Sequence, residues 1–313
     1  MQITAQMVKE LREKTGAGMM KCKEALQECN GNFEEAVDFL RKKGLASADK
    51  RSGRATSQGL VIPLTTEDRR TAAIVEVNCE TDFVARNENF VAFAEKVANF
   101  VLNTASIKNV EDLEKATIDG QSGEEFRKSM VANTGENISF GRVERFEIPA
   151  GNYGIFDTYV HGDGNIGVLV QLATENEAAA KSEDTLNLAH EIALQAAAMK
   201  PVYTTSKEVP TEALAREKDV ILGQIKNDPK NANKPEEIMN KIVEGRLAKY
   251  YKEYCLVEQA YVKDDSKSIN DLAEDLSKKL GAKVTVVTFR RWALGEGNAE
   301  ESTPEEKSAE AAG

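Results

Sequence analysis

The sequence of 313 residues lacks any run of about 18 apolar residues, the minimum for a membrane-spanning helix. Its first residues also lack the apolar stretch of a secretory signal peptide. Hydrophobic residues make up 41% of the chain and charged residues 30%, which is enough to build cores under a polar surface. We therefore expect a soluble, cytoplasmic protein of two or three domains with no membrane partner.

Cysteine and histidine are both scarce. The four cysteines form no CxxC pair, and only two histidines could join them as metal ligands. Scattered cysteines in a cytosolic chain are normally reduced. We therefore expect free thiols and no metal site.

Motifs for nucleotide binding and hydrolysis are also missing. The chain contains neither a phosphate-binding GxxxxGKS/T loop nor a GxSxG nucleophile elbow. Residues 162–167 match GxGxxG, but predicted strands flank them on both sides, which favours a hairpin turn. Glu80 and Asp82 alternate along an expected extended segment and should face opposite ways, and His161 lies at a predicted hairpin tip. We expect a protein that is not an enzyme and has no cofactor.

The charge balance is acidic. A formal net charge of −11 argues against direct binding of nucleic acid. Part of it comes from the end of the chain, where six glutamates stand against Lys307 alone. We expect residues 293–313 to form an acidic disordered tail.

The first 45 residues predict a bundle of three short helices. Helix signals are an N-cap at Thr4, glycine stops at Gly16 and Gly44, and a capping box that begins at Asn32. The glycine-rich connection 15–20 allows two interpretations, a loop packed on the core or a methionine contact surface. Residues 46–58 read as a linker with three basic residues, and a helix there is the alternative.

The pattern of strands and helices occurs twice in the remaining chain. A hairpin at 59–77, helices at 88–104 and 124–133 and a strand at 138–148 form the first copy. A hairpin at 154–172, helices at 184–199 and 269–280 and a strand at 284–289 form the second. The fold class is therefore α+β, with two related core lobes at 59–149 and at 150–204 plus 258–292.

Residues 205–257 interrupt the second copy. Helix starts at Pro210 and Pro235, with a break at Asp228-Pro229, predict an antiparallel helical hairpin with a narrow apolar seam. Its second arm carries a basic side, for which a solvated surface is the simplest explanation. The basic residues are Lys241, Arg246, Lys249 and Lys252. The hairpin could serve self-association or contact a partner.

The turn from Asn78 to Asn87 joins the most apolar predicted strand to the helix at 88–104. Phe83 in this turn has two interpretations. It is either a staple packed on the core of its own lobe, which is the commoner role of an aromatic residue, or a probe that inserts into a partner.

Four segments resemble the bacterial translation elongation factor Ts family in collinear order. They are VKELREKTGAGMM at 8–20, EVNCETDFVARN at 76–87, His161 with IGVLV at 166–170, and VEGR at 243–246. The resemblance covers roughly residues 1–292. It implies that the N-terminal bundle is similar to a ubiquitin-associated (UBA) domain.

The resemblance also implies a function. The expected partner is the GTPase elongation factor Tu, from which such a protein releases GDP so that GTP can load. Asp82 and Phe83 match the pair that wedges near the Mg²⁺ site of the GTPase, within the segment from Thr81 to Val84. Other expected partner contacts are Lys9, Arg12, Met19, Met20 and His161.

Two features depart from the family pattern. The chain after residue 294 turns acidic, where many family members carry a further module. Glu191 follows His190 where a basic or histidine pair is expected, so we carry no contact over to His190. The sequence does not decide whether Asp82 or Phe83 dominates. The resemblance does make one firm prediction, that Phe83 is exposed in the free protein.

Overall fold

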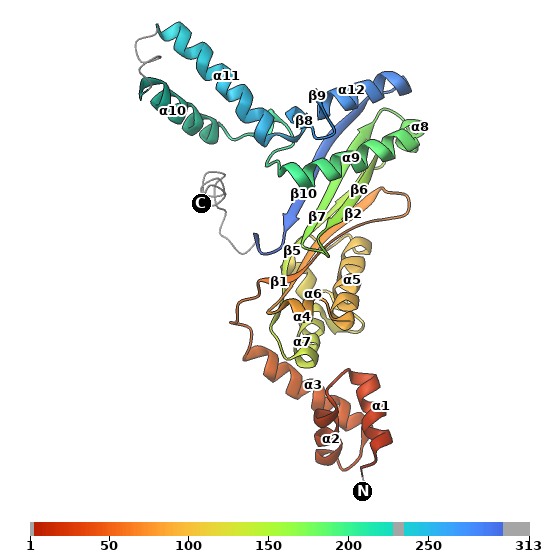
Figure 1. Cartoon of the computed structure of the whole chain (residues 1–313). Coiled ribbons are helices and arrows are strands. Elements are labelled where there is room, and N and C mark those ends of the chain that lie inside the picture. Colours follow the sequence, from red (N-terminus) through yellow and green to blue (C-terminus); the bar gives the residue numbers. More distant parts are fainter. Residues whose placement is uncertain (1–2, 228–234, 297–313) are drawn as a thin grey trace.

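The computed structural model describes residues 3–227 and 235–296. An N-terminal helical bundle lies at one end, two lobes lie in the middle, and a helical hairpin projects at the other end (Figure 1). The bundle contains the helices α1 (Ala5–Thr15), α2 (Met19–Glu28) and α3 (Phe33–Asp49). Leu11, Cys22 and Leu26 are fully buried at its centre.

The third helix does not stop at Gly44, so that prediction is wrong. It continues to Asp49, and Ala48 packs into the core of the first lobe. A Cβ atom at Gly44 would lie only 2.7 Å from the Cβ atom of Ala132. Gly44 is therefore a site of close helix packing rather than a stop, and α3 connects the bundle directly to the first lobe.

The first lobe is an antiparallel sheet covered by helices. Its strands β1 (Gln58–Thr65), β2 (Thr71–Cys79) and β5 (Ile138–Glu147) lie in the order β1-β2-β5. The longer helices are α5 (Glu88–Asn103) and α7 (Gly123–Thr134). The sequence did not predict α4 (Asp82–Ala85), α6 (Val110–Lys115) or the two-residue strands β3 (Thr117–Ile118) and β4 (Gln121–Ser122).

The second lobe repeats this plan. Its strands β6 (Tyr153–His161), β7 (Ile166–Thr174) and β10 (Val284–Ala293) lie in the order β10-β7-β6. Its helices are α8 (Glu177–Ala180), α9 (Glu183–Met199) and α12 (Ile269–Leu280), with short strands β8 (Ala260–Tyr261) and β9 (Asp264–Ser268). In both lobes the second strand of the hairpin is central, and a short helix follows it directly. The predicted duplication and the α+β fold class are confirmed.

The two lobes meet through a shared apolar cluster. Phe156 and Leu169 of the second lobe are fully buried against Ala72 and Ile74 of the first, with Trp292 beside them. Two ion pairs also cross the boundary, Arg69 with Asp157 and Arg290 with Glu144. The lobes are therefore held both by apolar burial and by charge.

The projecting hairpin consists of α10 (Thr211–Asn227) and α11 (Glu236–Tyr254), flanked by the 3₁₀ turns Ser206–Glu208 and Leu256–Glu258. A narrow seam of Ile221, Ile225, Val243 and Leu247 is buried between the arms. The predicted hairpin is confirmed, while the predicted break at Asp228-Pro229 lies outside the described residues.

The chain after β10 begins as part of the folded core. Ala293 still belongs to the strand, and Leu294 packs on the cluster between the lobes. The side chain of Glu296 lies 3.4 Å from the guanidinium of Arg291. The expected disordered tail therefore does not begin at residue 293, because residues 293, 294 and 296 contact the folded core. Residues 297–313 lie outside the described part of the chain.

Candidate functional site

The turn after β2 contains a short helix, α4, where we expected an extended connection. Thr81 is its N-cap, and the hydroxyl oxygen of Thr81 accepts a hydrogen bond from the backbone N–H of Val84 at 3.4 Å. Ala85 is buried, and Val84 packs partly on the lobe core. Two of the four helical side chains therefore anchor α4 inward, which leaves the other two, Asp82 and Phe83, on the outer surface.

Phe83 is 83% exposed, which confirms the exposure that we predicted. The staple interpretation is wrong, because Phe83 takes no part in the core of its own lobe. Burying a phenylalanine side chain is worth about 1.5–3 kcal/mol, and the free protein gains none of this energy here. An aromatic ring held out on a capped helix is a ready apolar contact for another molecule.

Asp82 is exposed next to Phe83 and has a local structural role. It is the acidic residue in the first turn of α4, where a carboxylate interacts favourably with the helix dipole. Its carboxylate also lies 3.9 Å from the guanidinium of Arg86, one helical turn away. The presence of aspartate at position 82 is thus partly explained by its contribution to the stability of α4.

The duplicated lobe shows what the fold requires at these positions. In the second lobe, α8 is capped by Asn176 and carries Glu177, Ala178, Ala179 and Ala180 in place of Asp82, Phe83, Val84 and Ala85. Glu177 forms the same ion pair one turn on, with Lys181 at 2.6 Å. The acid therefore occurs in both copies, whereas the position of Phe83 is filled by an exposed alanine. The fold does not need an aromatic residue there.

Two carboxylates, Glu136 and Glu80, link the turn to the start of the neighbouring strand β5. Glu136 accepts hydrogen bonds from the hydroxyl of Thr81 at 2.6 Å and from the backbone N–H of Thr81 at 3.0 Å. Glu80 accepts one from the backbone N–H of Asn137 at 2.5 Å. The segments 80–81 and 136–137 thus hold each other reciprocally. Sequence analysis missed Glu136, because the contact spans 55 residues and has no local signal.

Cys79, the last residue of β2, also holds the N-cap residue Thr81. Its buried thiol donates a hydrogen bond to the carbonyl oxygen of Thr81 at 3.2 Å. Burial, and then the nearby Glu136 carboxylate, raise the pKa of Cys79 to about 12. The thiol therefore stays protonated at neutral pH and serves as a structural donor rather than a nucleophile.

His161 lies at the end of β6, exposed to solvent. The hydroxyl of Tyr159 lies 3.0 Å from its Nδ1 atom. The turn that follows is docked on the first lobe, because the backbone N–H of Val61 donates to the carbonyl oxygen of Gly164 at 2.8 Å. The turn that follows His161 therefore lies beside β1, the strand that pairs with the strand leading to α4.

The bundle presents the other predicted contact residues. Lys9 and Arg12 are exposed on α1, and Met19 and Met20 are 58% and 76% exposed at the start of α2. Ala17 in the same connection is buried in the bundle core. The middle of this connection therefore packs on the core, while its methionines face outward, and the methionine contact surface stays a prediction.

Known proteins that resemble this chain match it over almost its whole length. A family described as "Elongation factor TS" matches residues 80–296. Curated proteins named "Elongation factor Ts" from Clostridium perfringens and Nostoc punctiforme are 45% and 42% identical to it, over 296 and 297 residues. These alignments cover 94% and 95% of this chain and 94% and 93% of the relatives.

The chain belongs to the elongation factor Ts family. It is therefore a translation elongation factor. The resemblance stated from the sequence motifs is confirmed, and the two-lobed α+β core is consistent with it. The likeness of the bundle to a UBA domain stays a prediction.

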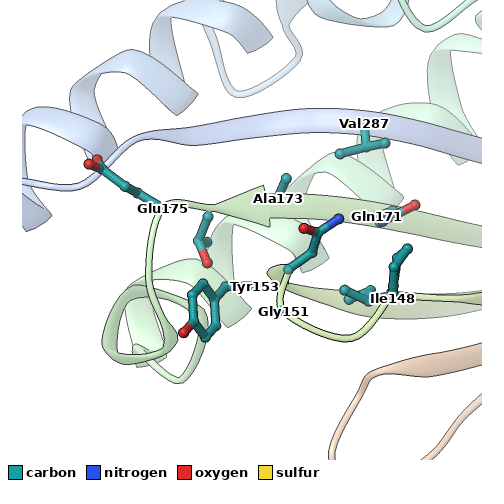
Figure 2. Close-up of a pocket in the computed structure, with 10 residues that line it drawn as sticks. Ile148, Gly151, Tyr153, Gln171, Ala173, Glu175 and Val287 are labelled. Atoms are coloured by element: carbon teal, nitrogen blue, oxygen red, sulfur yellow. The ribbon is translucent and has the colours of Figure 1, made fainter.

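Two hollows lie among the described residues of this elongation factor Ts family member. A hollow of about 420 Å³ lies over the second-lobe sheet, and Figure 2 shows its lining side chains spread over the strands and the connection between β5 and β6. Its described lining includes the carboxylate of Glu175, which already accepts a hydrogen bond from the backbone N–H of Lys283. A hollow of about 710 Å³ at the base of the helical hairpin is lined by both lysines and acids.

The described residues contain neither a candidate metal cluster nor a candidate membrane span. Within residues 3–227 and 235–296, no group of three or more His, Cys, Asp or Glu side chains is arranged to hold a metal ion. In the same ranges, no helix is both long and apolar enough to cross a bilayer.

Proposed function

We propose that this protein is a guanine-nucleotide exchange factor for elongation factor Tu. It would bind the GDP form of the GTPase, insert Asp82 and Phe83 near the Mg²⁺ site, and release GDP so that GTP loads. Family membership supports the partner. The observation that carries the mechanism is the exposure of Phe83 on a helix whose counterpart in the second lobe has alanine at this position.

The physical reasoning requires no covalent chemistry. A GTPase holds GDP through a phosphate-binding loop and a Mg²⁺ ion that bridges to the β-phosphate. A rigid aromatic side chain that displaces this loop weakens both contacts. The protein would therefore act without being an enzyme in the covalent sense and without a cofactor of its own, on the Mg²⁺ and GDP of its partner.

Remote contacts would hold the wedge in place. Lys9, Arg12, Met19 and Met20 on the bundle and His161 on the second lobe are exposed and separate from α4, which suits a wide docking surface. Linkage requires reciprocity: if this protein weakens GDP binding, GDP weakens the binding of this protein by the same factor. The complex with GDP and Tu together is then a short-lived intermediate, as exchange needs.

Phe83 would contribute more to nucleotide exchange than Asp82. The acid recurs as Glu177 in the second lobe and is explained there by the helix dipole and the ion pair with Lys181. The aromatic ring has no such local explanation. We therefore expect Phe83→Ala to reduce exchange more than Asp82→Ala does.

The test measures release of a fluorescent GDP analogue from Tu. Catalytic amounts of this chain should speed release, and the double variant Asp82→Ala with Phe83→Ala should lose most of the acceleration while it still binds Tu. Ala178→Ser, at the matching position of the second lobe, is the control. Unchanged release with the wild-type chain would refute exchange activity and leave an adaptor that recruits Tu.

The cellular context follows from this role. A factor that serves Tu would work in the cytoplasm, without direct contact to nucleic acid. Self-association through the helical hairpin stays a prediction, which the mass of the purified complex decides.

A further inference from the structure

The duplicated lobes allow the support of α4 to be compared with that of α8. The connection from α7 to β5 contains Gly135, Glu136 and Asn137, and the connection from α12 to β10 contains Gly281, Ala282 and Lys283. Gly135 and Gly281 both cap their helices in the left-handed conformation, at φ +79° and +61°. The two connections therefore correspond residue by residue.

One contact is common to both lobes. Glu80 accepts a hydrogen bond from the backbone N–H of Asn137, and Glu175 accepts one from the backbone N–H of Lys283 at 3.0 Å. This carboxylate precedes the N-cap of α4 in one lobe and of α8 in the other. Because the bond occurs with either short helix, it belongs to the fold of the lobe.

The second contact is specific to the first lobe. Glu136 accepts hydrogen bonds from both the backbone N–H and the hydroxyl of Thr81, at 3.0 and 2.6 Å. Its counterpart, Ala282, has no side-chain acceptor that could bind the N-cap residue of α8. Among the differences between the two short helices and their supports, Phe83 occurs with Glu136, and Ala178 occurs with Ala282.

The bonds from Glu136 act directly on the geometry of α4. The hydroxyl hydrogen of Thr81 points to Glu136, so a lone pair of the same oxygen is free to accept from the backbone N–H of Val84. A helix of four residues has little stability of its own and depends on such anchors. Hydrogen bonds to a carboxylate are stronger than neutral ones, so Glu136 fixes the first residue of the helix that carries Phe83.

We propose that Glu136 is a positioning residue for the Phe83 wedge. The inference rests on the proposed exchange function and extends it. Glu136 holds Thr81, Thr81 caps α4, and α4 directs the ring of Phe83 outward. The second lobe folds with alanine at both positions, so this support serves the projecting ring rather than the fold.

The experiment compares four proteins: the wild type, Glu136→Ala, Glu136→Gln, and Glu175→Ala as the control from the second lobe. Release of a fluorescent GDP analogue from Tu is measured across a range of factor concentrations. Glu136→Ala should lower the rate at saturating factor by about tenfold, since a misdirected group loses its effect over small displacements. The concentration for half-maximal rate should change by less than about threefold.

The other two variants separate positioning from stability. Glu136→Gln retains an oxygen that accepts from the Thr81 hydroxyl, and should restore most of the rate. Glu175→Ala removes the hydrogen bond from the backbone N–H of Lys283, which has a counterpart in the first lobe. With this variant, Tu should release GDP at the wild-type rate. A wild-type rate for Glu136→Ala, or an equal loss in Glu175→Ala, would overturn the proposal.

Hydrogen exchange of the free proteins provides a readout that does not depend on Tu. Glu136→Ala should speed exchange of the backbone amides in residues 81–86 and leave those of residues 176–181 unchanged. If the wild-type chain fails to release GDP, the proposed function is refuted, and this comparison still decides whether Glu136 holds α4. Unchanged exchange at 81–86 would refute the positioning role by itself.

Discussion

Replacing Glu76 with glutamine would break an ion pair whose carboxylate is almost fully buried in the core. Glu76 is 1% exposed on β2, and its carboxylate lies 2.7 and 2.6 Å from Nε and Nη2 of Arg142. It also accepts hydrogen bonds from Nδ2 of Asn78 at 2.8 Å and from the backbone N–H of Gly295 at 3.1 Å. Arg142 in turn donates to the carbonyl oxygen of Ala293. This cluster attaches the end of β10 to the first lobe.

The expected loss follows from this burial. Glutamine keeps the volume of the side chain but removes the charge. Its NH₂ group would also face the N–H donors of Asn78, Arg142 and Gly295. Removing one partner of a buried ion pair costs about 3–5 kcal/mol. The side chain of Arg142 is 24% exposed, so water relieves part of this cost and we expect about 3 kcal/mol. Glu144→Gln is the matched control: its pair with Arg290 is about one-third exposed on both sides, and its loss should be about 1 kcal/mol or less.

The single tryptophan of the sequence reports this region directly. Trp292 is 6% exposed, and the guanidinium carbon of Arg142 lies 4.6 Å from its ring centroid. Urea unfolding followed by Trp292 fluorescence gives the free energy of unfolding for each variant, with circular dichroism as the test of a single transition. Equal losses in Glu76→Gln and Glu144→Gln, or a loss below about 1 kcal/mol in Glu76→Gln, would refute the reasoning from burial.

Further predictions concern the bundle contact and the β1–β2 turn. Gly44→Ala should lower the free energy of unfolding by roughly 1 kcal/mol, because its new Cβ would meet Ala132 at 2.7 Å. Gly223→Ala on α10, where nothing lies within 4 Å of the new Cβ, should instead raise it by up to about 1 kcal/mol; thermal unfolding compares the two. Hydrogen bonds from the Thr66 hydroxyl and the Arg70 backbone lower the pKa of Asp68 below 3.8, so its ionised form stabilises the fold above that value and the contribution is lost as pH falls through the lowered pKa. Asp68→Asn should therefore destabilise the protein at about pH 7 but much less at about pH 3, and urea unfolding at both pH values tests the difference.

The main elements of the core could be predicted because their signals are local. The continuous apolar run of β2 and the helical spacing of Phe90, Ala94 and Val97 in α5 placed a strand and a helix correctly. The duplication followed from the repeated order of such elements. The narrow seam of the hairpin was visible for the same reason, since Ile221, Ile225 and Leu247 recur at helical spacing. Val243 was not predicted in this seam, where Ile242 was expected instead.

The errors have physical causes. A glycine can either end a helix or allow close helix packing, and the sequence alone does not distinguish these roles at Gly44. Only the contact with Ala132, which is distant in sequence, reveals close packing. A helix of four residues, such as α4, is too short for periodicity to show. Glu136 could not be linked to Thr81 from sequence, because that contact forms only when α7 and β5 are placed beside β2.

The most direct test of the proposed mechanism is the rate of GDP release from Tu at saturating concentrations of Phe83→Ala. Burial of the ring is worth about 1.5–3 kcal/mol, which corresponds to about 10- to 150-fold in rate if that energy is used only when the nucleotide site opens. We predict a loss in this range at saturation, with a small change in the concentration for half-maximal rate. A saturating rate equal to that of the wild type would contradict the role of Phe83 as the wedge.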